Sequence, residues 1–434
     1  MAGGVETHFD ELQPFRQVLR NDTQEISMTT NVQLAHRGAD APVERQPIGR
    51  DAARLRAAIA DLAPELAARA GEIESARRVP ADITDRLGAL GLFRTLVPRS
   101  HGGLELSVPE VLPLIEALSA ADSSVGWVAM IGTGAQLFRT RVSRALFDQI
   151  VMDGPDALTV GVGTPAGRGE AIDGGYRVSG RWPFASGCQN ARWIAGHFVI
   201  HKDGAPVMSD GRPLTRFVVL SAEHWRVEET WQASGLTGSG SHHVVLDNVA
   251  VRDAETFDLF HGPSCLPGPF ASAVTPFIGS LHAAVATGIA TAAMADLAAM
   301  AGRRQLFAAA DLRDTPVFQH EFGRLDAALR AARALLQVQA DSYWRLALAG
   351  ELDGKADFAE SLQGSAWINA TCSDIVSGCY TLGGSSVVFN ASPLQRRLRD
   401  IHVARQHAFA QERFYARAGA NALGFPPVDP ISGQ

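Results

Sequence analysis

The sequence predicts an α+β multidomain protein with an N-terminal all-α domain, a central β domain and a C-terminal helical bundle. Apolar residues recur every three or four positions up to about residue 153, which predicts amphipathic helices. Strand-like runs separated by Gly, Asp and Pro turns follow, and the helical period returns from Pro269. A length of 434 residues suffices for two or three domains. The expected parts are a disordered tail over 1–45, a helical domain over 46–155, a β domain over 156–260 and a bundle over 265–425.

The first helical domain is predicted from one long amphipathic segment and two further helices. Pro80 opens the second helix and Gly91 ends it. Ser107 and Glu110 form a capping box in front of the third. The first helix covers 50–78, and its apolar stripe consists of Leu55, Ile59, Leu62 and Leu66.

The central domain is predicted to be a small barrel or a sandwich, because short strands alternate with turn residues. Asp173-Gly174-Gly175 is a hairpin signal between two of the strands. The predicted strands are 158–162, 176–182, 193–201, 215–221 and 244–251.

The last domain is predicted to be a four-helix bundle. The segment 271–302 is apolar enough to suggest a membrane span, but His282 and Asp296 within it favour a buried bundle helix. The four predicted helices are 271–302, 315–349, 357–378 and 393–418.

Charge and composition exclude several classes of partner. The net charge of −7 and the lack of a basic block argue against nucleic acid and against anionic membranes. Four cysteines without a CxxC pair indicate a reducing cytoplasm, and no signal peptide is evident. Met28, within the polar tail, is an alternative to Met1 as the start. His242 and His243 are adjacent on a strand and point to opposite faces, so we expect no metal site.

The stretch from Trp231 to Ser241 combines three glycines with small hydroxyl residues and leads into a strand. Such a loop can close its N–H groups and hydroxyls around an anionic ligand, and it can equally be a plain hairpin loop. No GxGxxG follows a strand, so nicotinamide binding is not indicated.

Six stretches, in this order over about residues 50 to 420, resemble the acyl-CoA dehydrogenase superfamily. The resemblance implies that family's fold: an N-terminal all-α domain, a central β-barrel and a C-terminal four-helix bundle. The stretches are GLFRTLVP (91–98) with His101-Gly102-Gly103, DSSVGWV (122–128), WPFASG (182–187), the 231–253 run, Gly383-Gly384, and RLRD (397–400).

The position of the catalytic base distinguishes the branches of this superfamily. An acyl-CoA dehydrogenase carries a Tyr-Glu pair shortly after its R-D pair, but here that place is taken by His407-Ala408. Alanine cannot abstract a proton, and only Glu321 on another helix could substitute. The histidine instead resembles the oxygenase components of two-component flavin-dependent monooxygenases, such as those that hydroxylate hydroxyphenylacetate and polycyclic substrates.

That resemblance implies a cytoplasmic homotetramer that takes reduced FMN or FAD from a separate reductase. With O2 it would form a C4a-hydroperoxyflavin that hydroxylates an aromatic or natural-product small molecule. The alternatives are an acyl-CoA dehydrogenase or oxidase, an N- or S-oxygenating relative, and a non-catalytic flavin carrier.

The resemblance also assigns site residues. Ser186 is expected beside flavin N5, and His407 is expected to protect or protonate the peroxide or to deprotonate a phenol. Each could instead be structural. The expected flavin contacts are Trp182, Ser186, Gly187, Thr237, Gly238, Ser239, Ser241, Arg303, Gly383 and Gly384, and the expected substrate contacts are His101, Trp127 and Phe138.

Several of these assignments have a plainer alternative. Gly383 and Gly384 could merely end a helix, and Arg303 could compensate helix C-terminal charge. Some phenol hydroxylases of the family carry a histidine in the helix after GWV, whereas here AMIGTGAQLF (129–138) contains none. If that histidine handles the phenol proton, its absence makes a bulkier natural-product, heteroatom or polycyclic substrate as strong an expectation as a simple phenol.

Overall fold

The N-terminal helices of the computed structural model begin where the sequence signals place them. The structure describes residues 49–271, 274–302 and 311–426, so the expected tail and Arg303 lie outside the described residues. Ser107 Oγ accepts from Glu110 N–H, and the Glu110 carboxylate accepts from Ser107 N–H at 2.9 Å, which confirms the capping box. The helices described before the sheet are α1 (Arg50–Ala68), α2 (Ala70–Ala76), α3 (Ala81–Leu90), α4 (Val108–Ala121), α5 (Ser123–Arg139) and α6 (Arg144–Met152).

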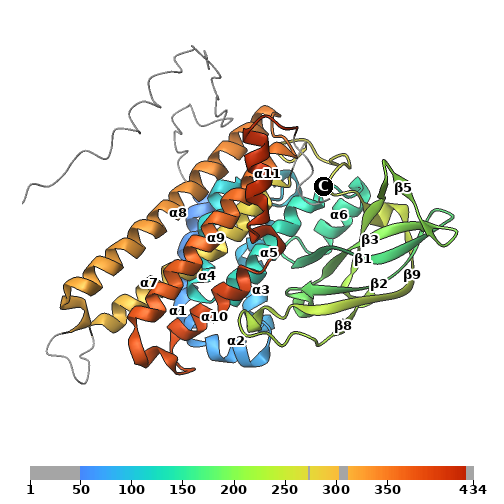
Figure 1. Ribbon diagram of the computed structural model, residues 1–434. Coiled ribbons are helices and arrows are strands. Elements are labelled where there is room, and N and C mark those ends of the chain that lie inside the picture. Colours follow the sequence, from blue (N-terminus) through green and yellow to red (C-terminus); the bar gives the residue numbers. More distant parts are fainter. Residues whose placement is uncertain (1–48, 272–273, 303–310, 427–434) are drawn as a thin grey trace, which may run out of the picture. The chain divides into compact units, whose positions relative to one another are not determined.

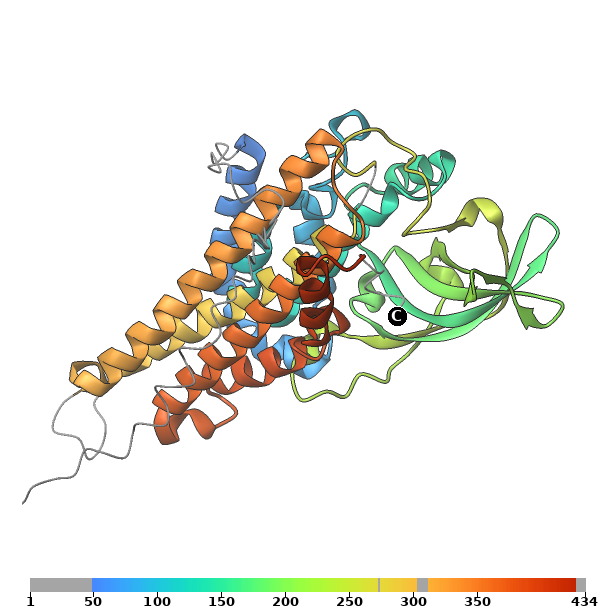
Figure 2. The ribbon, with the colours of Figure 1, turned by 45° about the horizontal axis from the view of Figure 1, so that its top comes forward.

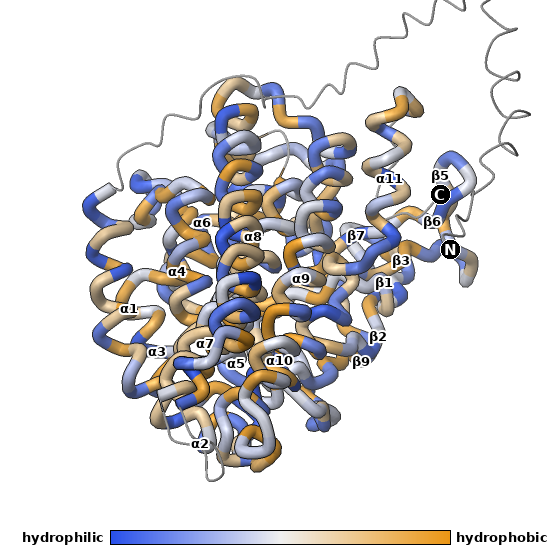
Figure 3. Tube along the Cα trace, turned by 60° about the vertical axis from the view of Figure 1, so that its left-hand side comes forward, coloured by the Kyte–Doolittle hydropathy of each residue, from blue (hydrophilic) through white to orange (hydrophobic). Residues whose placement is uncertain are grey.

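The first predicted helix is interrupted at Arg69, which separates α1 from α2 (Figure 1). The Arg69 guanidinium binds the carboxylates of Glu72 and Asp82, on α2 and α3. Along α1, hydrophobic and hydrophilic segments alternate in Figure 3, as expected for a helix with one buried face.

The central strands form one eight-stranded mixed sheet in the order β10-β7-β3-β1-β2-β9-β8, with β4 paired to β3. The Asp173-Gly174 turn joins β1 to β2, and Gly174 has φ +69°, which confirms the hairpin. No pairing joins the end strands β8 and β10 among the described residues, so the predicted barrel is an open sheet. The strands are β1 (Thr159–Ile172), β2 (Gly175–Ala185), β3 (Trp193–Lys202), β4 (Ala205–Pro206), β7 (Thr215–Ser221), β8 (Arg226–Glu228), β9 (His242–Arg252) and β10 (Thr256–Phe257), with β5 (Met208–Ser209) and β6 (Arg212–Pro213) as a separate pair.

The C-terminal helices run alongside one another in Figures 1 and 2. The predicted helix 393–418 is wrong as a single element, because α10 ends at Ala404 and α11 begins only at Arg413. A 3-10 turn over Ala408–Ala410 lies between them, which places His407 in a connection and not in a helix. The C-terminal helices are α7 (Pro276–Ala301), α8 (Pro316–Ala349), α9 (Ala356–Leu382), α10 (Pro393–Ala404) and α11 (Arg413–Ala422).

Helix α7 is, by length and composition, the one described helix that could cross a membrane. This is weak grounds for a span, since a core helix passes the same test. Most of α7 is buried among neighbouring helices, including α9 and α4. Its packing agrees with the predicted buried bundle helix.

Candidate active site

The candidate site lies where α5, the end of β2 and the loop before β9 meet. Trp127 on α5 donates its indole N–H to Ser186 Oγ at 3.0 Å. Ser186 Oγ lies 2.7 Å from Ser241 Oγ, which lies 2.7 Å from Ser239 Oγ. All four residues are buried, so the three hydroxyls form a hydrogen-bonded chain that ends on the indole.

A slip in the β2–β9 pairing produces this arrangement. The register shifts between Trp182 and Ala185, so the residues between them leave the regular ladder. The chain then turns at Gly187, whose N–H donates to Ser239 O at 2.9 Å and whose φ is +76°. The turn thereby places Ser186 beside the loop that carries Ser239 and Ser241.

Two imidazoles lie against the same indole. The rings of His282 on α7 and His407 are stacked, with centroids 4.0 Å apart and planes at 27°. Trp127 meets both rings edge-on, at 5.4 Å from His282 and 5.6 Å from His407. Phe409 packs against both imidazoles from another side, at 5.7 and 5.2 Å.

The connection between α10 and α11 fixes the tautomer of His407. Its Nδ1 accepts from Phe409 N–H at 3.2 Å, in the manner of a helix N-cap, so the ring proton resides on Nε2. Burial lowers the pKa of His407 to about 4. Burial, and then the charge of His407, holds the pKa of His282 well below its usual range. Both rings are therefore neutral at pH 7.

A buried charged cluster ties this connection to the glycine loop. Asp400 on α10 accepts from Leu236 N–H at 2.7 Å. Arg397 on α10 donates to Ala120 O at 2.9 Å, at the end of α4. Asp122, which accepts from the first N–H groups of α5, lies within the electrostatic reach of both. These contacts fix the positions of α10, the glycine loop and α5 relative to one another.

Replacing Asp122 with asparagine tests the charge in this cluster. Burial raises the pKa of Asp122 to about 6, so the folded protein binds its proton more tightly than the unfolded chain. The stability this group contributes is full below about pH 4 and is lost as the pH rises through 6. Asparagine is neutral and caps helices equally well. We expect Asp122→Asn to gain about 1–3 kcal/mol over the native protein between pH 4 and 7 in urea unfolding.

An Asp122→Ala variant separates the cap from the charge. It loses the hydrogen bonds to Ser124 N and Val125 N, and we expect it to be less stable than Asp122→Asn at every pH. A pH-independent difference between Asp122→Asn and the native protein would contradict the argument.

The glycines of the loop have a packing role in the structure. A Cβ on Gly235 would lie 2.3 Å from Arg399 O, and a Cβ on Gly238 would lie 2.2 Å from the Ile73 side chain. Gly238, Ser239 and Ser241 are buried, so contact with a flavin phosphate would require them to leave this packing. Thr237 keeps some exposed surface, and its phosphate contact stays a prediction.

The aromatic side chain that β2 exposes here is Phe184, not the predicted Trp182. The Trp182 ring is fully buried in the sheet and donates to His197 O. Phe184 is 64 % exposed with φ +64°, a left-handed conformation that a bulky residue rarely adopts. Its ring meets that of Trp231 edge-on at 6.2 Å. No sequence pattern indicates this residue, because both its exposure and its φ arise from the bulge.

Other predicted contacts lie elsewhere. His101 packs edge-on against Phe147 and lies 2.9 Å from an Arg144 nitrogen, both on α6, away from the imidazole pair. Phe138 joins a small cluster with Phe358 and others, which Phe409 also contacts. Gly383 and Gly384 follow the last residue of α9, a helix of 27 residues that begins near Phe358. A helix of that length measures about 40 Å, so they do not join His407 within one chain.

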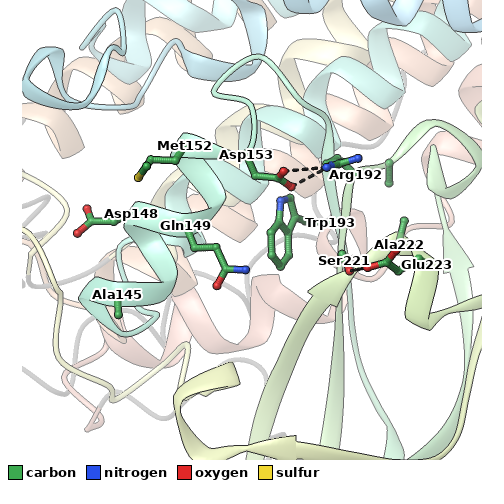
Figure 4. A pocket seen from close by; sticks show the side chains of 11 residues that line it. Ala145, Asp148, Gln149, Met152, Asp153, Arg192, Trp193, Ser221, Ala222 and Glu223 are labelled. Atoms are coloured by element: carbon green, nitrogen blue, oxygen red, sulfur yellow. Dashed lines mark hydrogen bonds and ion pairs between the residues drawn. The ribbon is translucent and has the colours of Figure 1, made fainter.

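Two cavities are described, and neither is lined by Ser186 or His407. The larger, about 750 Å³, lies between α6 and the ends of β3 and β7 (Figure 4). Asp153 and Arg192 form a two-point ion pair at its edge, with Trp193 beside them. The smaller, about 400 Å³, is bordered by Phe358, whose ring lies 6.0 Å from Phe409. The rings of Phe358 and Phe409 therefore lie between this cavity and the imidazole pair.

No carboxylate takes part in the ring and hydroxyl contacts around His407 that the structure describes. Glu321, the alternative base, is on α8 and binds Arg324 and His320. Glu412 binds Arg405 at 2.8 Å. Among residues 49–271, 274–302 and 311–426, no group of three His, Cys, Asp or Glu side chains could hold a metal ion.

Comparison with known proteins assigns the fold and the family. The acyl-CoA dehydrogenase N-terminal domain model matches residues 50–140, and the C-terminal domain model matches residues 280–412. The fold is shared with XiaF from Streptomyces sp., solved with FADH2 and glycerol, at a TM-score of 0.80 and 24% identity over 87% of this chain and 96% of that one. The chain is thus an acyl-CoA dehydrogenase-fold protein.

Two relatives define the branch. The indole-3-acetate monooxygenase of Pseudomonas putida is 33% identical over 83% of this chain and 91% of its own. The flavin-dependent monooxygenase oxygenase subunit HsaA of Mycobacterium tuberculosis is 30% identical over 88% of this chain and 98% of its own. The chain belongs to the family of flavin-dependent monooxygenase oxygenase components, as its sequence motifs predict.

Proposed function

We propose that this enzyme hydroxylates a small aromatic substrate that carries an O–H or N–H group, bound beside the side chains of Trp127 and His407. The observation that carries this proposal is the pair of neutral imidazoles on Trp127, at the place where a dehydrogenase needs a carboxylate. His407 offers an Nε2 proton and Ser186 offers a hydroxyl. These groups can position and protonate; neither can abstract an α-proton as a carboxylate does.

The residues present fit a reduced flavin. Phe184 exposes a flat apolar ring two residues before Ser186. The fold holds its backbone in a strained conformation, with φ +64°. When bound, the flavin supplies the two electrons that activate dioxygen. Phe184 would support its ring system, and Ser186 would hydrogen-bond its polar edge. FMN and FAD both remain within this proposal.

The proposal is tested by binding and by product analysis. Reduced flavin is expected to bind more tightly than oxidised flavin, and indole-3-acetate or a phenol is expected to yield hydroxylated product together with hydrogen peroxide. A separate reductase delivers the reduced flavin. Anaerobic bleaching of bound FAD by an acyl-CoA would contradict the proposal and favour a dehydrogenase.

Phe184→Gly should separate flavin binding from stability. Glycine adopts φ +64° without strain. We therefore expect the free energy of unfolding of the apoprotein to rise by about 1 kcal/mol, which raises its midpoint temperature. Reduced flavin should nevertheless bind at least about tenfold more weakly, because the aromatic surface is lost. Calorimetry and flavin fluorescence measure the two effects. Unchanged flavin affinity would show that the ring serves another purpose.

We also propose a homotetrameric assembly and a cytoplasmic location. Val388 and Phe389 are exposed just after Gly383 and Gly384, which suits an interface at that end of α9. A partner subunit at this end could bring the glycine pair to a flavin phosphate. The four cysteines are free thiols, which suits a reducing compartment. Light scattering would test the assembly.

A further inference from the structure

The proposed function assigns no chemical step to the imidazole of His282, although this ring stacks on that of His407. It is buried on α7, a helix whose buried residues are almost all apolar or small. The contacts described for its ring are those with the rings of Trp127, His407 and Phe409. Buried polar side chains normally have a partner, and a lone imidazole in an apolar helix costs stability. Its presence therefore needs an explanation beyond packing.

The hydrogen bond of His407 makes this ring a donor toward a ligand and leaves His282 as the acceptor. Because His407 Nδ1 is occupied by Phe409 N–H, this ring can only donate toward a ligand, through Nε2. His282 stays neutral, so one of its nitrogens is an acceptor. Stacking at 4.0 Å prevents the two rings from hydrogen-bonding to each other in their planes. A ligand at their shared edge would thus meet one donor and one acceptor.

We propose that His282 accepts the hydrogen bond, and during the reaction the proton, from the O–H or N–H of the aromatic substrate. This inference rests on the proposed hydroxylation. It also explains how the site works without a histidine on α5, since α7 supplies an imidazole against the same Trp127.

His282 holds the substrate proton only during the reaction and returns it at the end. As a ring carbon of the substrate forms its new C–O bond with one oxygen atom of dioxygen, the O–O bond breaks and the other oxygen atom leaves with its electron pair. The two electrons of this reduction come from the reduced flavin. At the same time the O–H or N–H bond of the substrate breaks and its electron pair moves into the ring. The released proton binds His282. When aromaticity returns, the attacked carbon loses its own hydrogen as a proton to the departing oxygen, which becomes water. His282 then returns its proton to the heteroatom and is neutral again. A base of low pKa suffices, because the substrate group becomes strongly acidic while oxygen is added to the ring.

Ligand pairs that differ only in the N–H or O–H group test the acceptor without flavin. Indole and indene have nearly the same shape, as do phenol and toluene. Their affinities can be measured by isothermal titration calorimetry with the native protein. We expect indole and phenol to bind about tenfold more tightly than indene and toluene, since an acceptor left unsatisfied in a buried site costs about 1–3 kcal/mol.

Two variants separate the acceptor from the stacking. His282→Phe keeps a ring against His407 but has no nitrogen, so the preference for indole and phenol should disappear. His282→Gln lacks the ring but has an acceptor oxygen, so part of the preference should return. If His282 were purely structural, His282→Phe would retain more of the preference for indole and phenol than His282→Gln. His402→Phe, on the exposed side of α10, is the matched control and should behave as the native protein.

The outcomes are distinct from those of the proposed function, which is judged by reduced-flavin binding and hydroxylated product. A native protein that shows no preference within either ligand pair, or binds none of the four, overturns the role of His282. So does a His282→Phe variant that retains the native preference. With reduced flavin, dioxygen and indole-3-acetate, His282→Phe should also shift consumption of reduced flavin from product to hydrogen peroxide at unchanged flavin affinity.

Discussion

Replacing His407 with alanine should reduce the yield of hydroxylated product per reduced flavin by about 10²–10⁴-fold, the usual contribution of a positioned acid or base. The Nε2–H of His407 is the donor that the α10–α11 connection presents beside Trp127. Without it, dioxygen should still be consumed, but the electrons should leave as hydrogen peroxide. Product and peroxide, measured in the same reaction, report this partition.

His407→Asn distinguishes the chemistry from the cap. Asparagine can accept from Phe409 N–H as histidine does, so the turn over Ala408–Ala410 should keep its conformation. We expect this variant to bind reduced flavin normally and to uncouple as strongly as His407→Ala. If His407→Asn formed product at the native ratio, the histidine would be only a cap.

The pH dependence of coupling follows from the neutral state of the ring. Burial lowers the pKa of His407 to about 4, so its protonation state should not change between pH 5 and 8. Loss of product in that range must then come from other groups. If the product yield of the native protein fell as the pH dropped below about 6.5, and that of His407→Asn did not, the pKa of His407 would not be lowered. The ring would then be in contact with water.

The order of helices and strands was predictable because periodicity is local. The stripe of α1, the capping box of α4 and the Asp173-Gly174 turn each depend on residues a few positions apart. The break in the predicted 393–418 helix was not, since it depends on a histidine acting as a cap, which periodicity does not register.

Parts of the site were predictable only by resemblance, and parts were not predictable. Ser186 and His407 were placed by motif, and the structure brings both against Trp127. His282 was missed because its helix has the composition of a buried core element. Phe184 was missed because a bulge decides which residue of β2 is exposed. The close packing of Gly235 against α10 and of Gly238 against α2 was not predictable, because it depends on residues far away in the sequence.

The largest effect on stability is expected at Gly235. A Cβ at this position would lie 2.3 to 2.7 Å from three backbone atoms of Arg399 and Asp400. Backbone cannot rotate aside as a side chain can, so Gly235→Ala must push the loop away from α10. That movement breaks the hydrogen bond from Leu236 N–H to Asp400. We expect a loss of about 3 kcal/mol or more in the free energy of unfolding, at the upper end of overpacking effects.

Gly323→Ala is the matched control for Gly235→Ala, because no heavy atom lies within 4 Å of a Cβ built at Gly323 on α8. Alanine in a helix interior should stabilise the protein by about 0.5–1 kcal/mol. Urea unfolding of the two variants should therefore move in opposite directions. Reduced flavin should bind more weakly to Gly235→Ala alone, because its loop also positions Ser239 and Ser241 behind Ser186. If both variants were equally stable, the loop would not be held by α10 in solution, and the arrangement around Ser186 would need another support.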